Sequence, residues 1–383
     1  MASYSEYGTL QTVILGSVDD YQPAIWCWKS NDIYQAKNFK DAISIAKTAI
    51  PKNILEEVHE DLEDYKKILT NLGVKVIRPP RNFNDPVLET ESVLAFGQDF
   101  YNMRDLHVVL GEVIVTSAPA QPNRILEIQN LRNFFNSIAI DYKMTLVQSP
   151  VPELKNNPER AYVRNEVGDL EAHEENTAIL LGMVTPQIWH RLEEKELLFD
   201  AANLVRFGSE VLYLISSTGN RLGFDWLKKT INTFKFNATD VYRSSHLDST
   251  ILPLDEDTFL VNSVRVNEEN LPQILKNKKI LYFGDVETIP EIDINFHVDH
   301  RIPAAKQIEN LGFTTNLKDM SSPWAGLNVL SFDEKTIMVE SNQKKLINFL
   351  ESHGYQIIPV RMRHPYTMLG GLHCTTLDLE RQC

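Results

Sequence analysis

The segment 370–379, near the C-terminus, offers a thiol in a position suited to chemistry. Two glycines at its start let the backbone turn without steric cost. From Cys374 onward, polar and apolar residues alternate with the period of a β-strand, so the cysteine shares a polar face with Thr376 and Asp378. We therefore expect Cys374 to open a strand and to act as a nucleophile. The alternative is a buried cysteine that serves only as a small apolar side chain, as most free cysteines do.

Other side chains that could do chemistry lie directly before predicted β-hairpins. They are Asp105 before residues 107–115, Asp200 before 204–215, His246 and Asp248 before 250–262, and Ser321 and Ser322 before 328–340. In a pseudo-symmetric ring, equivalent positions meet around one axis, so these side chains would line one central cavity. Each also has an ordinary structural explanation, such as an ion pair between Asp105 and Arg104, or turn formation at the two serines.

Nucleophilic catalysis needs a thiolate, a nearby proton carrier and a group that orients the carrier. Cys374, His246 and Asp200 can fill these three roles. Two further carboxylates, Asp105 and Asp248, suit a planar cationic substrate, because a guanidinium offers a fork of donors that matches carboxylates. A guanidinium bound beside Cys374 would also lower the pKa of the thiol.

The elements that must position these residues follow one repeated pattern, a β-hairpin, a helix and a further strand. Hairpins are predicted at residues 107–115, 204–215, 250–262 and 328–340, helices at 53–72, 124–136, 224–234, 270–275 and 343–353, and closing strands at 74–77, 144–147, near 241, at 279–283 and at 355–360. Strands at 12–15 and 374–379 could pair and close the ring, which removes free sheet edges. We expect an α/β fold, with residues 1–383 as a single domain of five units. The alternative is an ordinary α/β domain without a repeat.

Composition excludes several classes of protein. The chain has 383 residues, is 43% hydrophobic and carries a net charge of −14, without the basic cluster that a nucleic-acid-binding protein needs. No apolar run reaches the length of a membrane span, and the N-terminus lacks a secretory signal. Three cysteines are too few for a disulfide scaffold, so we expect a cytoplasmic protein. Residues 17–51, 149–168 and 288–302 are predicted to be loops that shape a substrate entrance.

At its polar residues the chain resembles the glycine amidinotransferases, meaning arginine:glycine amidinotransferase and its bacterial natural-product relatives. The matching segments are Met103-Arg104-Asp105 (PRD in the family), Phe199-Asp200-Ala201-Ala202-Asn203 (FDAAD), Gly219–Trp226 (TNxLGIEW), His246-Leu247-Asp248 (HID), Ser321-Ser322-Pro323-Trp324 with Leu327–Leu330 and Asp333–Lys335 (SSKW…NVLxLDE), and Gly370–Cys374 (GGxHC). Several motifs in the same order make this resemblance specific, and it is clearest from about residue 102 onward.

The resemblance implies a five-bladed α/β propeller, the pentein fold, and an amidinotransferase that needs neither cofactor nor metal. It implies that Cys374 attacks the guanidinium carbon of L-arginine, that L-ornithine leaves, and that an amine acceptor then takes the amidino group from sulfur. His246 would carry protons in both half-reactions of a ping-pong scheme, oriented by Asp200. Asp105 and Asp248 would bind the guanidinium, and Arg265, Ser321 and Ser322 the carboxylate of the donor. Relatives are often homodimers.

The chain also departs from the family pattern. Asn203 replaces an acid, and Tyr242-Arg243-Ser244-Ser245 does not match the glycine enzyme. We therefore expect the acceptor to be glycine or a larger amine, and these departures favour an amine from a specialised biosynthetic pathway. One alternative is a hydrolase of the same fold, such as an arginine deiminase, which would give citrulline. Another is a non-catalytic binding module. His373 is expected to be structural, pointing to the opposite strand face, and Cys27 and Cys383 have no assigned role.

Overall fold

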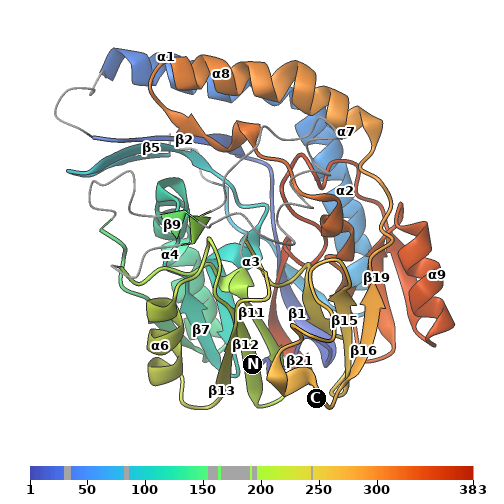
Figure 1. The fold of residues 1–383 in the computed structure, drawn as a ribbon. Coiled ribbons are helices and arrows are strands. Elements are labelled where there is room, and N and C mark those ends of the chain that lie inside the picture. Colours follow the sequence, from blue (N-terminus) through green and yellow to red (C-terminus); the bar gives the residue numbers. More distant parts are fainter. Residues whose placement is uncertain are drawn as a thin grey trace.

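The computed structural model describes residues 1–29, 36–81, 86–153, 163–164, 190–191, 196–242 and 245–382. Five three-stranded sheets of identical connectivity dominate it (Figure 1). In each, two strands pair antiparallel, and a third lies parallel to the middle strand. In sheet order the strands are β21 Thr376–Gln382, β1 Thr9–Leu15, β3 Lys75–Ile77; β6 His107–Leu110, β7 Val113–Thr116, β8 Thr145–Gln148; β11 Leu204–Phe207, β12 Glu210–Leu214, β13 Lys235–Thr239; β14 Ile251–Pro253, β15 Thr258–Asn262, β16 Lys279–Phe283; and β18 Leu330–Ser331, β19 Thr336–Glu340, β20 Gln356–Val360.

The first and last strands of the chain share one sheet. β1 pairs antiparallel with β21, from Leu15 opposite Thr376 to Thr9 opposite Gln382. Both chain ends lie at the lower side of the molecule in Figure 1. The predicted pairing of terminal strands therefore occurs, although β21 begins at Thr376 and the preceding residues 372–375 form a turn. The prediction that Cys374 opens the strand is wrong.

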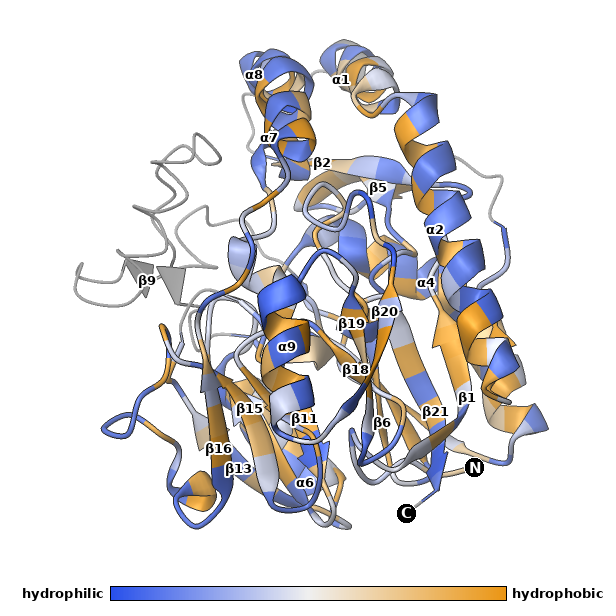
Figure 2. Cartoon of the chain, turned by 90° about the vertical axis from the view of Figure 1, so that its right-hand side faces the viewer, coloured by the Kyte–Doolittle hydropathy of each residue, from blue (hydrophilic) through white to orange (hydrophobic). Residues whose placement is uncertain are grey.

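Helices connect the middle strand to the parallel third strand in four of the five sheets, a right-handed crossover being the usual connection. They are α2 Lys52–Asn71, α4 Pro122–Asp141, α6 Arg221–Thr230 and α9 Lys344–Ser352. α2 buries Ile54, Val58, Leu62, Tyr65 and Leu69, one helical stripe, and Figure 2 shows hydrophilic and hydrophobic residues alternating along α2 and α9. α6 begins three residues earlier than predicted because Asn220 caps it, its side chain accepting from the N–H of Gly223 at 3.0 Å.

In the fourth sheet the predicted helix at 270–275 is only a 3-10 turn, Gln273–Leu275. Further short elements lie near the ring axis or in connections: α3 Met103–Leu106, the paired β9 Val163–Arg164 and β10 His190–Arg191, and the 3-10 turns Ala201–Asn203, Asn316–Lys318 and Pro323–Leu327.

The expectation of a loop at residues 17–51 is wrong. This segment contains β2 (Gln22–Trp28) and α1 (Ala36–Thr48). β2 joins β5 (Val93–Gln98), β4 (Val87–Glu89) and β17 (Thr314–Thr315) in a four-stranded sheet. α1 buries Phe39, Ala42 and Ala46 against β2 and α8, and the partners of β2 lie more than 60 residues away along the chain.

The expectation of a loop at residues 288–302 is also wrong. The chain forms α7 (Glu291–Phe296), a π-helical turn (His297–Arg301) and α8 (Ile302–Asn310) in succession. Pro290 and the acids that follow it indicated a loop, but a proline ahead of a helix and acids in its first turn are also typical N-terminal helix signals. Residues 154–162 and 165–168 of the remaining predicted loop lie outside the described residues. None of the helices in the described part of the chain combines the length and apolar composition that crossing a membrane requires.

Five charged side chains form a buried cluster where the chain ends meet the second and third sheets. Arg206 of β11 donates from Nε to Glu6 at 2.9 Å and also bonds Asp378 of β21. Asp378 accepts from Arg381 at 2.9 Å and from Arg104, and none of the five is more than 4% exposed. Because each of its three arginines lies beside at least one of its two acids, the cluster joins elements from both ends of the sequence through buried ion pairs.

Replacing one member of this cluster should therefore destabilise the whole ring. We expect Arg206→Met to lower the free energy of unfolding by about 3–5 kcal/mol, because Glu6 and Asp378 lose a buried partner. Urea denaturation would measure it. The control is Lys235→Met, which removes a surface pair with Glu210 and should change little. Equal effects of the two substitutions would contradict a role of the cluster in closing the ring.

Candidate active site

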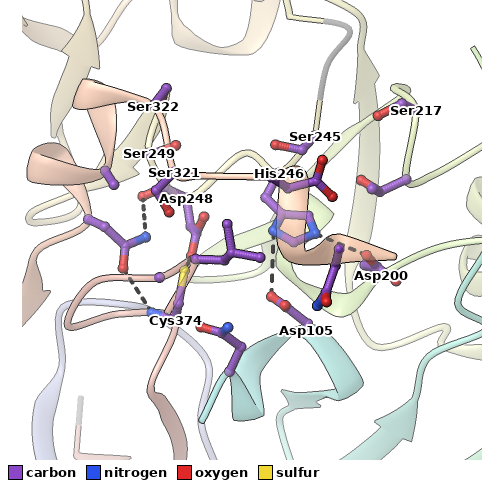
Figure 3. A pocket seen from close by; sticks show the side chains of 18 of the residues that line it. Asp105, Asp200, Ser217, Ser245, His246, Asp248, Ser249, Ser321, Ser322 and Cys374 are labelled. Atoms are coloured by element: carbon purple, nitrogen blue, oxygen red, sulfur yellow. Dashed lines mark hydrogen bonds and ion pairs between the residues drawn. The ribbon is translucent and has the colours of Figure 1, made fainter. Parts of the chain in front are cut away.

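One cavity of about 280 Å³ is lined by all eight side chains predicted to form the site (Figure 3). They are Asp105, Asp200, His246, Asp248, Arg265, Ser321, Ser322 and Cys374. Most lie just ahead of the first strand of a sheet: Asp105 in α3 before β6, Asp200 before β11, His246 and Asp248 before β14, and Cys374 before β21. The repeated connectivity of the sheets thus brings positions up to 269 residues apart to one place.

His246 lies between two carboxylates. Its Nε2 is 3.0 Å from Oδ2 of Asp200, and its Nδ1 is 3.5 Å from Oδ1 of Asp105. Burial lowers the pKa of His246, but the charges of Asp105 and Asp200 and the hydrogen bond to Asp200 outweigh it and raise the pKa to about 9. The imidazole is therefore protonated at neutral pH and available as an acid. It lies in the irregular segment directly before β14, as does Asp248.

Cys374 is held by its neighbours on both sides. Its backbone N–H donates to Oδ1 of Asn328 at 2.9 Å, and its Sγ donates to Oδ2 of Asp248 at 3.3 Å. A Cβ added at Gly370 would lie 2.8 Å from the Cβ of Cys374 and would overlap the side chain of Asn102, so close packing requires glycine there. Burial, followed by the charges of Asp248 and Asp105, raises the pKa of the thiol well above its usual range.

His373 was expected on the opposite face of a strand, away from the site, and this was wrong because residues 372–375 form a turn. Its Nδ1 lies 2.9 Å from Oδ2 of Asp248, and its Nε2 lies 3.3 Å from Oε2 of Glu6. Burial raises the pKa of Asp248, but the hydrogen bond and charge of His373 outweigh it and hold the pKa at about 2. Asp248 is thus ionised throughout the physiological range.

Two residues of the site were missed by sequence reasoning. Arg124, in the first turn of α4, donates from Nη2 to Oδ2 of Asp105 at 2.9 Å. Asn328 accepts a hydrogen bond from the backbone N–H of Cys374, and its Nδ2 lies 3.4 Å from the backbone carbonyl oxygen of Asp248. Asn328 falls inside a matched motif, which was a usable signal, whereas an arginine at a helix start gave none. Burial raises the pKa of Asp105 to about 6, although His246 and Arg124 oppose this.

A second region of the cavity contains a buried guanidinium surrounded by hydroxyl groups. Arg265 is 2% exposed and lies over the ring of Tyr242, with the guanidinium carbon Cζ 3.8 Å from the ring centre. It donates to Oη of Tyr242 at 3.0 Å, to Oγ of Ser322 at 3.3 Å and to Thr250 at 2.7 Å. Ser321 also lines this region. A guanidinium at the cavity wall suits an anionic group of a ligand, because it can form charge-assisted hydrogen bonds.

The opposite wall carries neutral polar side chains. Ser217, Thr218 and Ser245 line it together with Gln121, and Figure 3 places Ser217 and Ser245 on the far side of His246 from Cys374. Asn203, which departs from the family motif, packs behind this wall and donates to the carbonyl of Leu214 at 2.8 Å. Within the described residues, no group of three or more His, Cys, Asp or Glu side chains is arranged to hold a metal ion.

Comparisons with known proteins agree with this geometry, although no family model matches the chain. Inosamine-phosphate amidinotransferase 1 of Streptomyces glaucescens is 28% identical over 99% of this chain and 96% of its own length. L-arginine:L-lysine amidinotransferase of Pseudomonas savastanoi pv. phaseolicola is 24% identical, over 100% of this chain and 94% of its own length. The structure of an amidinotransferase of the saxitoxin biosynthetic pathway, from Microseira wollei, superimposes with a TM-score of 0.76 at 26% identity and covers 99% of this chain and 97% of its own.

Fold and site together define an α/β enzyme of the pentein fold. Its sequence relatives across the full length are amidinotransferases, as the motifs had indicated. Over its full length the chain is similar to amidinotransferases, among them inosamine-phosphate, arginine:lysine and glycine amidinotransferases.

The contact between Cys374 and Asp248 generates a test of the thiol's protonation state. We expect Asp248→Asn to speed alkylation of Cys374 by iodoacetamide at pH 8 by about tenfold, because removing a neighbouring negative charge favours the thiolate. Mass spectrometry of digested protein would give the rate for each cysteine. Cys27, which is distant from this carboxylate in the sequence and lies outside the cavity lining, is the internal control. Unchanged or slower alkylation of Cys374 would contradict this account.

Proposed function

We propose that the chain transfers the amidino group of L-arginine through a covalent amidino-cysteine at Cys374 to an amine acceptor and releases L-ornithine. The observation that supports this most is that the thiol hydrogen-bonds Asp248, in a cavity that Asp105 also lines. Two carboxylates beside a nucleophile fit a guanidinium, which can donate to both at once. They would repel an anionic electrophile.

Binding of the donor is proposed to create the nucleophile. In the free protein burial, followed by the negative charges of Asp248 and Asp105, raises the pKa of Cys374. A guanidinium between these carboxylates neutralises them, which lowers the pKa of the thiol, so the thiol proton passes to solvent water and Sγ becomes a thiolate. Sγ then forms a bond to the guanidinium carbon, and the bond from this carbon to the ornithine nitrogen breaks. His246 gives its proton to the leaving amine.

The second half-reaction reverses these roles. His246, now neutral, takes a proton from the acceptor amine, whose nitrogen bonds to the amidino carbon while the bond to Sγ breaks. Asp200, 3.0 Å from Nε2, holds the imidazole in place for both steps. Arg265, Ser321 and Ser322 are proposed to bind the α-carboxylate of arginine, because they line the cavity together and a guanidinium can form charge-assisted hydrogen bonds to a carboxylate.

The acceptor is proposed to be a larger biosynthetic amine that carries hydroxyl groups, and not glycine. Relatives act on different acceptors, as the names inosamine-phosphate and L-arginine:L-lysine amidinotransferase state. In this chain the wall beyond His246 offers the hydroxyls of Ser217, Thr218 and Ser245, which can exchange hydrogen bonds with hydroxyl groups. A homodimer and a cytoplasmic location remain predictions from the sequence.

The covalent intermediate gives a direct test. Protein mixed with arginine in the absence of acceptor should gain the mass of one amidino group and release ornithine in a burst of about one equivalent per chain. Intact-mass spectrometry and amino-acid analysis would measure both. Cys374→Ala should abolish both signals, and Cys27→Ala, the matched control, should keep them. Citrulline formed without any amine would show that the enzyme is a hydrolase and would contradict transfer. The absence of an adduct at saturating arginine would favour a binding module.

The acceptor can be tested with a panel of amines, following ornithine release from arginine. We expect a hydroxylated primary amine to exceed glycine in kcat/KM by at least about tenfold, because a site that hydrogen-bonds hydroxyl groups discriminates against ligands lacking them. Ser217→Ala should reduce turnover with that amine and leave turnover with glycine nearly unchanged. A preference for glycine, or an equal loss with both amines, would contradict the proposed acceptor.

A further inference from the structure

We propose that Arg124 is a positioning residue, which holds Asp105 in the orientation and charge state needed to bind the donor's guanidinium. This inference rests on the proposed use of Asp105 in donor binding. Arg124 lies in the first turn of α4 and is 7% exposed. It lines the same cavity as Cys374 and His246, yet it has no role in the reaction as proposed above.

One nitrogen of Arg124 contacts both ends of α3, the short helix that carries Asp105. Nη2 donates to Oδ2 of Asp105 at 2.9 Å and to the carbonyl of Asn102 at 3.3 Å. Nη1 lies 3.4 Å from Oδ2 of Asp99, whose Oδ1 in turn accepts the backbone N–H of Tyr101 at 2.8 Å. A single guanidinium therefore fixes both the carboxylate and the backbone that leads to it.

These contacts determine which oxygen of Asp105 is left for a ligand. Oδ2 is taken by Arg124. Oδ1 accepts no hydrogen bond from the described part of the chain, and Nδ1 of His246 lies 3.5 Å from it. A buried carboxylate oxygen without a hydrogen bond is costly unless a ligand satisfies it. Arg124 thus presents Oδ1 of Asp105 to the incoming guanidinium.

The positive charge of Arg124 is shared among three carboxyl groups. Besides Asp99 and Asp105, Oε2 of Glu127 lies 3.3 Å from Nη1. Burial raises the pKa of Glu127 to about 8, so this group is protonated at neutral pH and the charge of Arg124 acts mainly on the two aspartates. The charged and titratable groups that face Asp105 are Arg124, His246, Asp200, Asp248 and Cys374.

Among these groups only Arg124 and His246 are cationic, so loss of Arg124 should favour the protonated form of Asp105. The pKa of Asp105, already raised to about 6, would rise further. A protonated Asp105 cannot pair with a guanidinium. The pH below which arginine binding weakens should therefore move upward when Arg124 is replaced, and a purely structural residue would not produce this shift.

The test is calorimetric titration of arginine into Cys374→Ala protein, which binds without turnover, between about pH 5 and pH 9. In this parent, affinity should fall below about pH 6 as Asp105 becomes protonated. Adding Arg124→Met should shift this fall to higher pH and weaken binding at pH 7 by about tenfold or more. Adding Arg124→Lys should give a smaller shift, because an ammonium keeps the charge but cannot span the same partners. Arg132→Met, an exposed arginine of the same helix, is the control and should bind as the parent does.

A second measurement separates positioning from general damage. In Asp105→Asn protein, adding Arg124→Met should weaken arginine binding little further, because residues that act through one another are not additive. Additive losses, or a loss that is equal at every pH, would overturn the inference. If Arg124→Met does not fold, an unshifted pH profile in Arg124→Lys overturns it. A parent that binds no arginine at any pH would instead contradict the proposed function, and this inference with it.

Discussion

The site depends on keeping two carboxylates usable inside a buried cavity. An isolated buried charge is expensive, and each carboxylate here is held from behind by a buried donor: Asp105 by Arg124, and Asp248 by His373. Each donor contacts one carboxylate oxygen, Oδ2 of Asp105 or Oδ2 of Asp248, and so fixes the orientation of that carboxylate. The negative potential that remains on the cavity side favours a cation and keeps the thiol of Cys374 protonated until a cation arrives.

Closure of the ring and placement of the nucleophile are linked through one side chain. Glu6, near the N-terminus, lies in the buried cluster with Arg206 and Arg104, and its Oε2 also lies 3.3 Å from His373. His373 contacts Asp248, and Asp248 accepts a hydrogen bond from the thiol of Cys374, the residue that follows His373. The ion pairs that join the chain ends therefore also support the carboxylate that contacts Cys374, so stability and geometry of the site are not independent.

Much of this arrangement could be predicted from the sequence, and the failures have physical causes. Helical stripes of apolar residues predicted α2 and α9, and paired hydrophobic runs predicted the hairpins, to within a few residues. The repeat predicted that the eight candidate site residues would line one cavity, and they do. Elements defined by distant partners were not predicted: β2 pairs across more than 60 residues, and α1 packs against α8, which follows it by more than 250 residues. Arg124 was missed because its role depends on tertiary contacts that no local pattern indicates. Local alternation placed His373 on one face of a strand, but that strand begins only at Thr376.

The position of His246 favours transfer to an amine over transfer to water. Its two carboxylate neighbours raise its pKa to about 9, close to the value of about 10 that is typical of an alkylamine such as lysine. Proton transfer between groups of similar pKa is nearly balanced in both directions, so one imidazole can protonate a departing alkylamine and later deprotonate an arriving one. A histidine near its ordinary pKa would do the second step poorly. Asp105 thus belongs both to the pair of carboxylates that raises the pKa of His246 and to the pair that is proposed to bind the guanidinium.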